Sequence, residues 1–352
     1  MSRFLWDRFG ALDAYVPGEQ PRVDNLIKLN TNESPFPPSP RVEQALSGAA
    51  GRLRLYSDLS AAGLTGALSR DLGVEREQLI AGNGSDEILY FSMLCFGGQG
   101  ATFADITYGF YQVWADLIGI DAYLAPLRAD FSIDPEMYAG NSRMILIANP
   151  NAPTGMALGL DAIERVLSLN PDQVVVVDEA YVDFGAQSAL PLLKKYENLL
   201  VVRTFSKSRQ LAGARLGFAV GAPQLIEDLN KIRYSINPYN VNTLTQLAGT
   251  ASVEDVDYFN QTRAMIVENR EYTRVELEKL GFCVLPSSAN FLFARHPRMS
   301  GGEYMRALRA RNILVRWFDK ARISDYVRIS IGTRQQMQTL IEVTAGLEGQ
   351  GK

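Results

Sequence analysis

Histidine and cysteine are nearly absent from this chain of 352 residues, which contains one histidine and two cysteines. With His296 as the only imidazole, neither a Ser-His-Asp or Cys-His hydrolase nor a zinc site is expected, and no metal is predicted. Cys95 and Cys283 lie in apolar segments, where free cysteine behaves as a small hydrophobic residue. Acid-base chemistry in this protein must therefore use lysine, tyrosine, aspartate or a bound cofactor.

Positive charge is not in excess either, since 35 Lys and Arg face 39 Asp and Glu and the formal net charge is -4. A nucleic-acid partner would require a basic surface and is not expected. The longest apolar runs, such as 174–177, are far shorter than the roughly 18 residues of a membrane span, so no membrane partner is expected. Arg3, Asp7 and Arg8 interrupt the N-terminal region, which argues against a signal peptide and predicts a cytoplasmic location.

Proline and glycine dominate the first forty residues, which include the run SPFPPSP at 34–40 and predict an extended N-terminal arm over 1–40. From residue 79 short apolar runs alternate with amphipathic stretches, which predicts an α/β domain over 41–250 with one large, mainly parallel, seven-stranded sheet. The expected strands are 79–82, 101–104, 122–125, 144–148, 174–177, 199–202 and 216–220. No G-x-G-x-x-G follows a strand, which disfavours a nicotinamide-binding domain.

The last hundred residues have a different pattern. A long helix over 253–280 is predicted first, ended by Gly281. Four apolar segments then alternate with helical stretches, which predicts a smaller α+β domain over 251–352. These segments are 283–285, 291–293, 313–315 and 327–331.

Polar residues follow four of the expected strands, at the edge of the sheet where α/β proteins bind ligands. Ser85 and Asp86 begin a helix whose free N–H groups suit a phosphate, although Gly-Ser-Asp is equally an ordinary helix cap. Asn151 lies in a turn fixed by two prolines and a glycine. Asp178 follows four valines and needs a cation or strong donor, unless it caps a helix. Lys207 follows another apolar strand at the same edge, an unusual place for a lysine.

Together these groups match the outline of one cofactor. An aldehyde needs an amine, which Lys207 supplies, and a protonated pyridine nitrogen needs a carboxylate, which Asp178 supplies. Asn151 and Tyr181 offer hydrogen bonds to a ring oxygen. A phosphate group needs a helix N-terminus, hydroxyls and a guanidinium, which are present in Ser85, Asp86, Thr204, Ser206 and Arg215. Pyridoxal phosphate is therefore the predicted cofactor.

The chain resembles the pyridoxal-phosphate-dependent aminotransferases of fold type I, and among them the histidinol-phosphate aminotransferases, in six segments that cover most of its length. These segments are LNTNESPFPPSP, GNGSDE, NPNAPTG, DEAYVDF, TFSKSRQLAGARLG and VRISIGT. The resemblance implies that Lys207 binds the cofactor covalently and that Asp178 pairs with its pyridine nitrogen. It further implies Asn151 and Tyr181 at the ring oxygen, and the Ser85 and Asp86 backbone, Ser206 and Arg215 at the phosphate.

The same resemblance implies contacts from outside these strand ends. Tyr108 in ITYGFY matches an aromatic residue that stacks on the cofactor ring. Tyr56 in RLYSD matches a tyrosine that reaches the phosphate from a partner subunit, which implies a homodimer with shared active sites. Arg328 matches the arginine that pairs with the substrate α-carboxylate. Three more residues are implied to face the substrate, namely Tyr15, Asn290 and Arg316.

A fold of this type hosts several reactions. The resemblance implies transfer of an amino group from glutamate to imidazole acetol phosphate, which gives histidinol phosphate and 2-oxoglutarate in histidine biosynthesis. An aminotransferase for aromatic amino acids and a lyase similar to threonine-phosphate decarboxylase are the alternatives. The effector domain of a transcription regulator would need a DNA-binding domain, for which the arm is too short and too rich in proline. A phosphorylated substrate needs a second cationic site, for which Arg316 with Tyr15 is the candidate.

Overall fold

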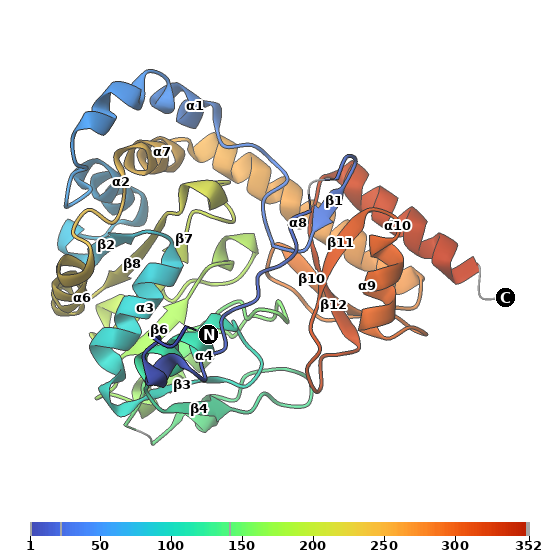
Figure 1. The fold of residues 1–352 in the computed structure, drawn as a ribbon, viewed down its shortest axis with the longest axis horizontal. Helices are drawn as coiled ribbons and strands as arrows, with labels where there is room; N and C mark the ends of the chain where they lie inside the picture. The colour runs from blue at the N-terminus through green and yellow to red at the C-terminus, as the bar shows by residue number, and fades with distance from the viewer. Residues whose placement is uncertain (1, 22, 141, 350–352) are drawn as a thin grey trace.

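The computed structural model describes residues 2–21, 23–140 and 142–349, and it contains two sheets flanked by helices (Figure 1). The larger sheet has the strand order β2-β8-β7-β6-β5-β3-β4. Its strands are β2 (Leu79–Gly82), β3 (Ala101–Ala104), β4 (Ala122–Ala125), β5 (Met144–Ala148), β6 (Val175–Asp178), β7 (Leu199–Thr204) and β8 (Gly217–Gly221). Only β8 runs antiparallel to its neighbours. The predicted α/β fold with a mainly parallel seven-stranded sheet is confirmed.

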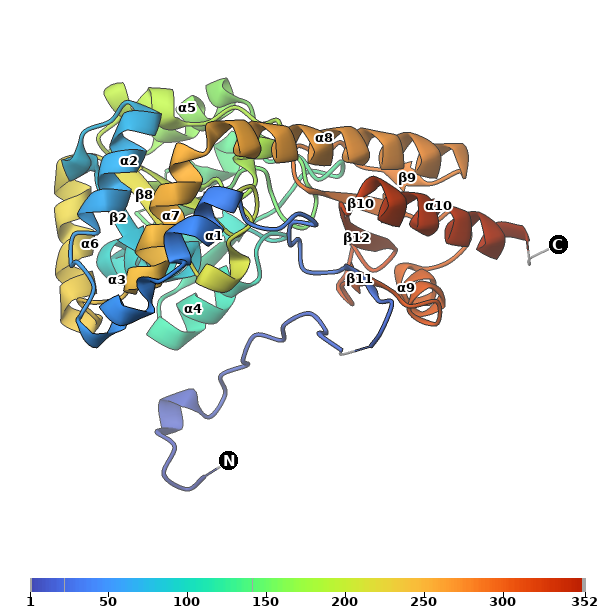
Figure 2. The ribbon, with the colours of Figure 1, turned by 90° about the horizontal axis from the view of Figure 1, so that it is seen from above.

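Both faces of the larger sheet are covered, which explains why its central strands are apolar at every position. Along β6, Val176 packs with helices α3 (Ser85–Phe96), α4 (Phe110–Ile118) and α6 (Pro223–Ile236). Val175 and Val177 point to the opposite face and pack with α5 (Leu160–Leu169). Three further helices lie over the β2 and β8 end, namely α1 (Pro40–Leu46), α2 (Ala62–Leu72) and α7 (Thr243–Glu254) (Figure 2).

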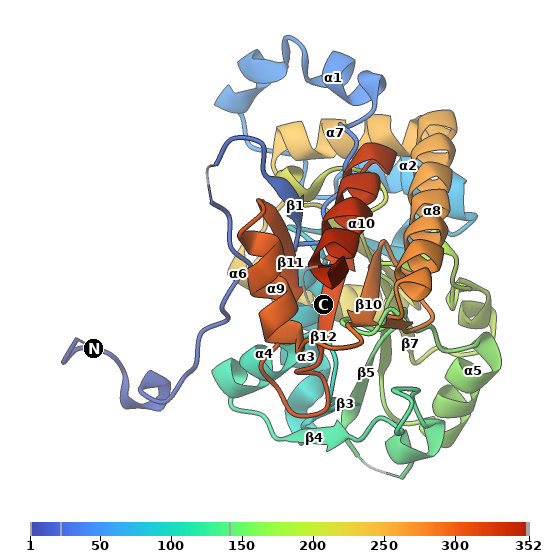
Figure 3. The same ribbon diagram turned by 90° about the vertical axis from the view of Figure 1, so that its right-hand side faces the viewer.

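The smaller sheet has the order β1-β11-β12-β10-β9. Its strands are β1 (Ile27–Leu29), β9 (Cys283–Val284), β10 (Phe291–Arg295), β11 (Ile313–Trp317) and β12 (Tyr326–Ser330). Helices α8 (Val256–Lys279), α9 (Gly301–Arg309) and α10 (Arg334–Gly349) cover one face (Figure 3). On the other face, Phe293 of β10 packs with the core of the larger sheet. The two cores are therefore in contact.

The region expected to form an arm divides into two parts. Residues 27–29 form β1, which pairs in parallel with Ile313–Val315 of β11 and so belongs to the smaller sheet. The preceding chain runs along the outside of the molecule (Figure 2). It is attached by the Arg8 guanidinium, which donates to the Leu117 carbonyl at 2.7 Å, and by the Tyr15 ring, which stacks on Phe110 with centroids 4.0 Å apart.

The long helix expected over 253–280 is confirmed as α8 (Val256–Lys279), except that residues 253 and 254 belong to α7. Helix α7 ends at Glu254 and α8 begins at Val256, because Asp255 leaves the helical conformation and its carboxylate accepts a hydrogen bond from the Tyr258 backbone N–H. Helix α8 then runs from the larger sheet to the smaller one (Figure 2). No helix in the described part of the chain is long and apolar enough to cross a bilayer.

Candidate active site

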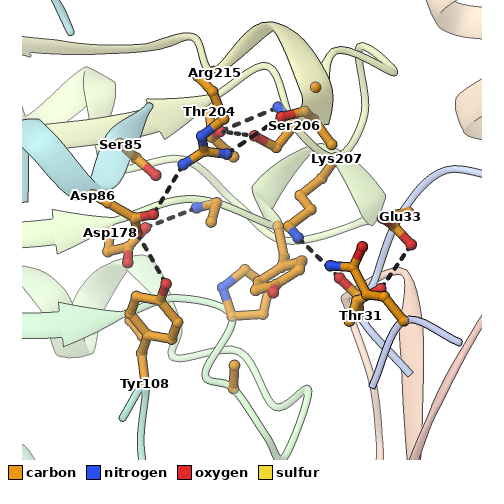
Figure 4. Close-up of a pocket in the computed structure, with 18 residues that line it drawn as sticks. Thr31, Glu33, Ser85, Asp86, Tyr108, Asp178, Thr204, Ser206, Lys207 and Arg215 are labelled. Atoms are coloured by element: carbon orange, nitrogen blue, oxygen red, sulfur yellow. Dashed lines mark hydrogen bonds and ion pairs between the residues drawn. The ribbon is translucent and has the colours of Figure 1, made fainter. Parts of the chain in front are cut away.

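A cavity of about 430 Å³ lies at the carboxyl edge of the larger sheet, where the sequence places the reactive residues (Figure 4). The arm side of the molecule contributes Gln20, Thr31 and Glu33 to its wall. Nine of the predicted cofactor-binding residues line it, namely Ser85, Asp86, Tyr108, Asp178, Tyr181, Thr204, Ser206, Lys207 and Arg215. The structure thus brings residues from four strand ends to one cavity.

Lys207 extends into this cavity from a turn directly after β7 (Figure 4). The turn is held by the Ser206 backbone N–H, which donates to Thr204 Oγ1 at 3.1 Å. The lysine amine donates to the Thr31 carbonyl at 3.4 Å and lies 5.8 Å from the centre of the Tyr181 ring. Among the described residues that line the cavity, Lys207 is the one lysine.

Asp178 is the last residue of β6 rather than the first residue beyond it, and only 5% of its surface is exposed. Its Oδ2 accepts a hydrogen bond from the Tyr111 hydroxyl at 2.7 Å, and its Oδ1 accepts one from the Ala180 backbone N–H at 3.1 Å. Burial raises the pKa of Asp178 from its ordinary 3.8 to about 6, although these two hydrogen bonds act in the opposite direction. The carboxylate is therefore poised to accept a cation or a strong N–H donor.

The part of the cavity next to the start of α3 is suited to an anion. Helix α3 begins there at Ser85, and the Arg215 guanidinium lies 3.1 Å from the Asp86 carboxylate. A side chain at Gly217 would place its Cβ 2.3 Å from the Ser85 backbone nitrogen, so glycine is required for the close approach of β8 to this helix start. Free helix N–H groups, hydroxyls and a guanidinium together fit a phosphate group.

Two polar residues flank the middle of the cavity. The Tyr181 hydroxyl accepts a hydrogen bond from Asn32 Nδ2 at 3.0 Å. Asn151 is buried just behind the cavity wall, where its carboxamide accepts from the Thr107 hydroxyl at 2.8 Å and donates to the Ile106 carbonyl at 2.9 Å. Asn151 itself is not among the lining residues, whereas its neighbours Pro150 and Ala152 are.

Tyr108 is held in the cavity wall by the first turn of helix α3. Its hydroxyl donates to Asp86 Oδ1 at 2.9 Å (Figure 4). Burial and the neighbouring Asp86 raise its pKa well above the ordinary value, so the hydroxyl stays protonated and remains a donor. The ring is thereby fixed against the cavity, as an aromatic residue that stacks on a bound ring requires.

Arg328 and Arg316 lie directly opposite each other on β12 and β11. Arg328 Nη2 donates to the Asn30 carbonyl at 3.0 Å, but its Nε is buried and has no hydrogen-bond partner in the described part of the protein. Arg316 donates to the arm carbonyls of Val16 at 3.1 Å and Pro17 at 3.4 Å. Burial lowers the pKa of Arg328, and the positive charge of Arg316 adds to this effect. Neither arginine lines the cavity that holds Lys207, and Arg316 lines a second pocket together with Glu19 and Arg309.

The other implied substrate and partner residues are also absent from the described lining of the cavity. Asn290 is fully buried and donates to the Asn32 carbonyl at 3.0 Å, and its Oδ1 has no partner among the described residues. Tyr15 stands on the arm and contacts Phe110 rather than the cavity. Tyr56 is 81% exposed and stacks on Tyr239 beside a different cavity. Within one chain, Tyr56 is therefore not part of the site.

A model of the family described as aminotransferase class I and II matches residues 24–343. This chain belongs to the class I and II aminotransferases. The membership confirms the fold type I resemblance and the enzyme class predicted from the six sequence segments. The roles of individual residues stay predictions, which the geometry above supports to different degrees.

Several known proteins similar to this aminotransferase are named histidinol-phosphate aminotransferases. The chain is 50% identical over 345 residues to histidinol-phosphate aminotransferase 1 of Bradyrhizobium diazoefficiens, with 97% of this chain and 99% of the relative covered. The crystal structure of histidinol-phosphate aminotransferase from Sinorhizobium meliloti in complex with pyridoxal-5'-phosphate is 26% identical, with a TM-score of 0.82 and 91% of each chain covered. L-Threonine-O-3-phosphate decarboxylase from Porphyromonas gingivalis is 22% identical, with a TM-score of 0.80 and 92% of this chain and 100% of that chain covered, and shares the fold.

Proposed function

We propose that this aminotransferase carries pyridoxal phosphate and interconverts histidinol phosphate and 2-oxoglutarate with imidazole acetol phosphate and glutamate, a step of histidine biosynthesis. The relatives named above support this substrate. The observation that carries the proposal is that two arginines lie directly opposite each other on β11 and β12, because two neighbouring positive charges would suit a phosphate dianion. An aromatic amino acid, with a single carboxylate, would leave one of them unused.

The cavity lining suits the proposed cofactor at its aldehyde, pyridine nitrogen, ring oxygen and phosphate. Lys207 would attach the aldehyde carbon, Asp178 would bind the pyridine nitrogen, and Tyr181 would contact the ring oxygen. Asn151, whose amide donates to the Ile106 carbonyl behind the cavity wall, would have to turn toward that oxygen to join Tyr181. Tyr108 would stack on the ring. The phosphate would lie between the start of α3 and Arg215, where the backbone N–H groups of Ser85 and Asp86 and the hydroxyls of Thr204 and Ser206 are available.

When bound, the cofactor supplies an electron sink for the negative charge that develops on the substrate α carbon. Asp178 holds the proton on the ring nitrogen, which keeps that sink effective. The Lys207 amine would take the proton from the substrate α carbon and return it. Tyr181 keeps the ring oxygen hydrogen-bonded.

Histidinol phosphate has no carboxylate, and its phosphorylated hydroxymethyl group is attached to the α carbon where glutamate has its α-carboxylate. Arg328 is therefore proposed to bind the phosphate in one half-reaction and the α-carboxylate in the other. Directly opposite like charges destabilise a pair of strands, and a phosphate dianion between Arg316 and Arg328 would remove this repulsion. A carboxylate carries half that charge, so Arg316 becomes the residue that distinguishes the phosphorylated substrate.

Replacing Arg316 with alanine is expected to lower kcat/KM for histidinol phosphate by about 10- to 150-fold, the loss that follows from one charge-assisted hydrogen bond. Histidinol and phenylalanine, which lack the phosphate, should lose much less. Arg309→Ala is the matched control, because it removes a neighbouring arginine whose guanidinium already forms an ion pair with Glu19 of the arm. An equal loss for all three substrates would make Arg316 structural and would favour the aromatic alternative.

We also propose that the enzyme is a homodimer in which Tyr56 completes the neighbouring site. Its exposure supports this, as does the exposure of Leu53 and Leu55 in the same segment, because such apolar side chains together mark a surface that a second copy covers.

Mixing two inactive variants tests the shared site, provided that each change alone is severe. If Lys207 and Tyr56 act from different subunits, a dimer of one Tyr56→Phe chain and one Lys207→Ala chain contains one intact site. Random mixing of equal amounts should then restore roughly a quarter of the wild-type activity. Heterodimers that form, as verified with two affinity tags, and yet remain inactive would exclude sharing.

A further inference from the structure

The segment from Asp178 to Asp183 contributes both to the cavity and to a network of ion pairs behind it. Asp178 and Tyr181 line the cavity. Glu179 and Asp183 instead contact Arg203 of β7, with Arg203 Nη2 2.9 Å from the Glu179 carboxylate and Arg203 Nη1 3.8 Å from the Asp183 carboxylate. The Glu179 side chain is completely buried, and it also accepts hydrogen bonds from Ser188 Oγ at 2.8 Å and the Ala189 backbone N–H at 2.6 Å. Two carboxylates thus hold one guanidinium in a fixed position.

This ion network reaches the turn that carries the reactive lysine. Ser208 directly follows Lys207, is buried, and donates its hydroxyl to Asp183 Oδ2 at 2.5 Å. Its carbonyl accepts a hydrogen bond from Gln210 Nε2 at 2.7 Å, and the same amide donates to Thr262 of α8 at 3.0 Å. Ser208 is therefore held through both its side chain and its main chain.

We propose that Asp183 is a positioning residue for Lys207, which acts through Ser208 while Arg203 and Glu179 hold Asp183 in place. A lysine side chain has several freely rotating bonds, so the place of its amine depends on how firmly its backbone is fixed. On one side of Lys207 the turn is fixed by the hydrogen bond between Ser206 and Thr204. On the other side, the bond between Ser208 and Asp183 has the same function.

The charge of Arg203 explains why an aspartate suits this position. A hydrogen bond to an ionised carboxylate is stronger than one between neutral groups, and Arg203 keeps the Asp183 carboxylate aligned with the serine. A displacement of a reacting group by about 1 Å can lower a rate a hundredfold. Loss of the hydrogen bond between Ser208 and Asp183 is therefore expected to lower the reaction rate more than it lowers the stability of the fold. The inference rests on the proposed attachment of the cofactor to Lys207.

The test compares Ser208→Ala, Asp183→Ala and the double variant with the wild-type enzyme. Each protein is prepared both as the holoenzyme and after removal of the cofactor. We expect each single change to slow attachment of added pyridoxal phosphate, followed by absorbance, by about 10- to 100-fold. The pH midpoint of the cofactor absorbance should shift, and kcat should fall while KM changes little. The double variant should be no slower than the slower single variant, because both changes remove the same bond. Ser208→Thr, which keeps the hydroxyl, should restore attachment.

Ser188→Ala is the matched control, because it removes a hydroxyl bond to Glu179 at the far end of the same network. It should leave the attachment rate within about twofold of the wild type while lowering thermal stability as much as Ser208→Ala does. A wild-type attachment rate in Ser208→Ala, or equal slowing in Ser188→Ala, would overturn the positioning role. Borohydride reduction of the wild type distinguishes failure of the proposed function from failure of this inference. An adduct on a lysine other than Lys207 would overturn both. An adduct on Lys207, together with variants that attach the cofactor at the wild-type rate, would overturn only the positioning role of Asp183.

Discussion

Lys207→Ala should lower kcat by about 10⁴-fold, the upper end of what one positioned acid-base group contributes. The expected loss is this large because Lys207 is proposed both to anchor the cofactor and to move the proton at the substrate α carbon. Each half-reaction, measured in a single turnover with histidinol phosphate or glutamate, should be affected alike. In the wild type, borohydride reduction followed by peptide mapping should find the cofactor on Lys207.

Lys28→Ala provides the control for this prediction. Lys28 forms an ion pair with Glu33, which lines the same cavity, and its amine also donates to the Thr31 hydroxyl at 2.9 Å. Its loss removes a lysine amine close to the site without removing the proposed anchor, so kcat should stay within about tenfold of the wild type. A reduced adduct on Lys28, or turnover in Lys207→Ala within tenfold of the wild type, would disprove the assignment.

Much of the site could be predicted because it depends on one topological rule. Parallel strands place their carboxyl ends at the same edge of the sheet, so residues after successive apolar runs come together even when they are far apart in the sequence. Asp178 ends one such strand, Ser85 and Lys207 follow two others, and all three residues line one cavity. The valines of β6 are informative for the same reason, since a strand that is apolar at every position must be covered on both faces.

Contacts that depend on how separate segments pack could not be predicted in this way. The Tyr111 hydroxyl donates to Asp178 across 67 residues of sequence, and nothing in the run YGFYQVW distinguishes it from its aromatic neighbours. The hydrogen bonds of Arg316 to Val16 and Pro17 join residues about 300 positions apart. The break at Asp255 had a local signal, an aspartate followed by a new amphipathic stretch, which the helical periodicity obscured.

Asp178→Asn is expected to lower kcat by roughly 10³-fold, which is what removal of one preorganised charge from a reacting centre costs. An amide has nearly the same shape as the carboxylate but cannot hold a proton on the pyridine nitrogen. The cofactor should therefore still bind, held by Lys207 and by the phosphate site around Arg215, while the ring withdraws electrons poorly. Cofactor content by absorbance and kcat by steady-state kinetics, measured on one preparation, separate binding from turnover.

The stability of the cofactor-free protein gives an independent measure of the same carboxylate. Its folded pKa of about 6 lies above the ordinary 3.8, so the protonated carboxyl favours folding below about pH 4 and this contribution is lost as the pH rises through 6. At neutral pH the buried charge should destabilise the cofactor-free protein by up to about 3 kcal/mol. The free energy of unfolding of Asp178→Asn, compared with that of the wild type, should therefore be equal at pH 4 and higher at pH 7.

Chemical denaturation at both pH values, with cofactor removed, measures this difference. A variant that is less stable than the wild type at pH 7 would show that the carboxylate serves the fold through Tyr111 and Ala180, as a structural cap does. A kcat of Asp178→Asn close to that of the wild type would also show that the carboxylate is a structural cap. A variant that gains stability while losing turnover would show that this buried charge is kept for the reaction at a cost to the fold.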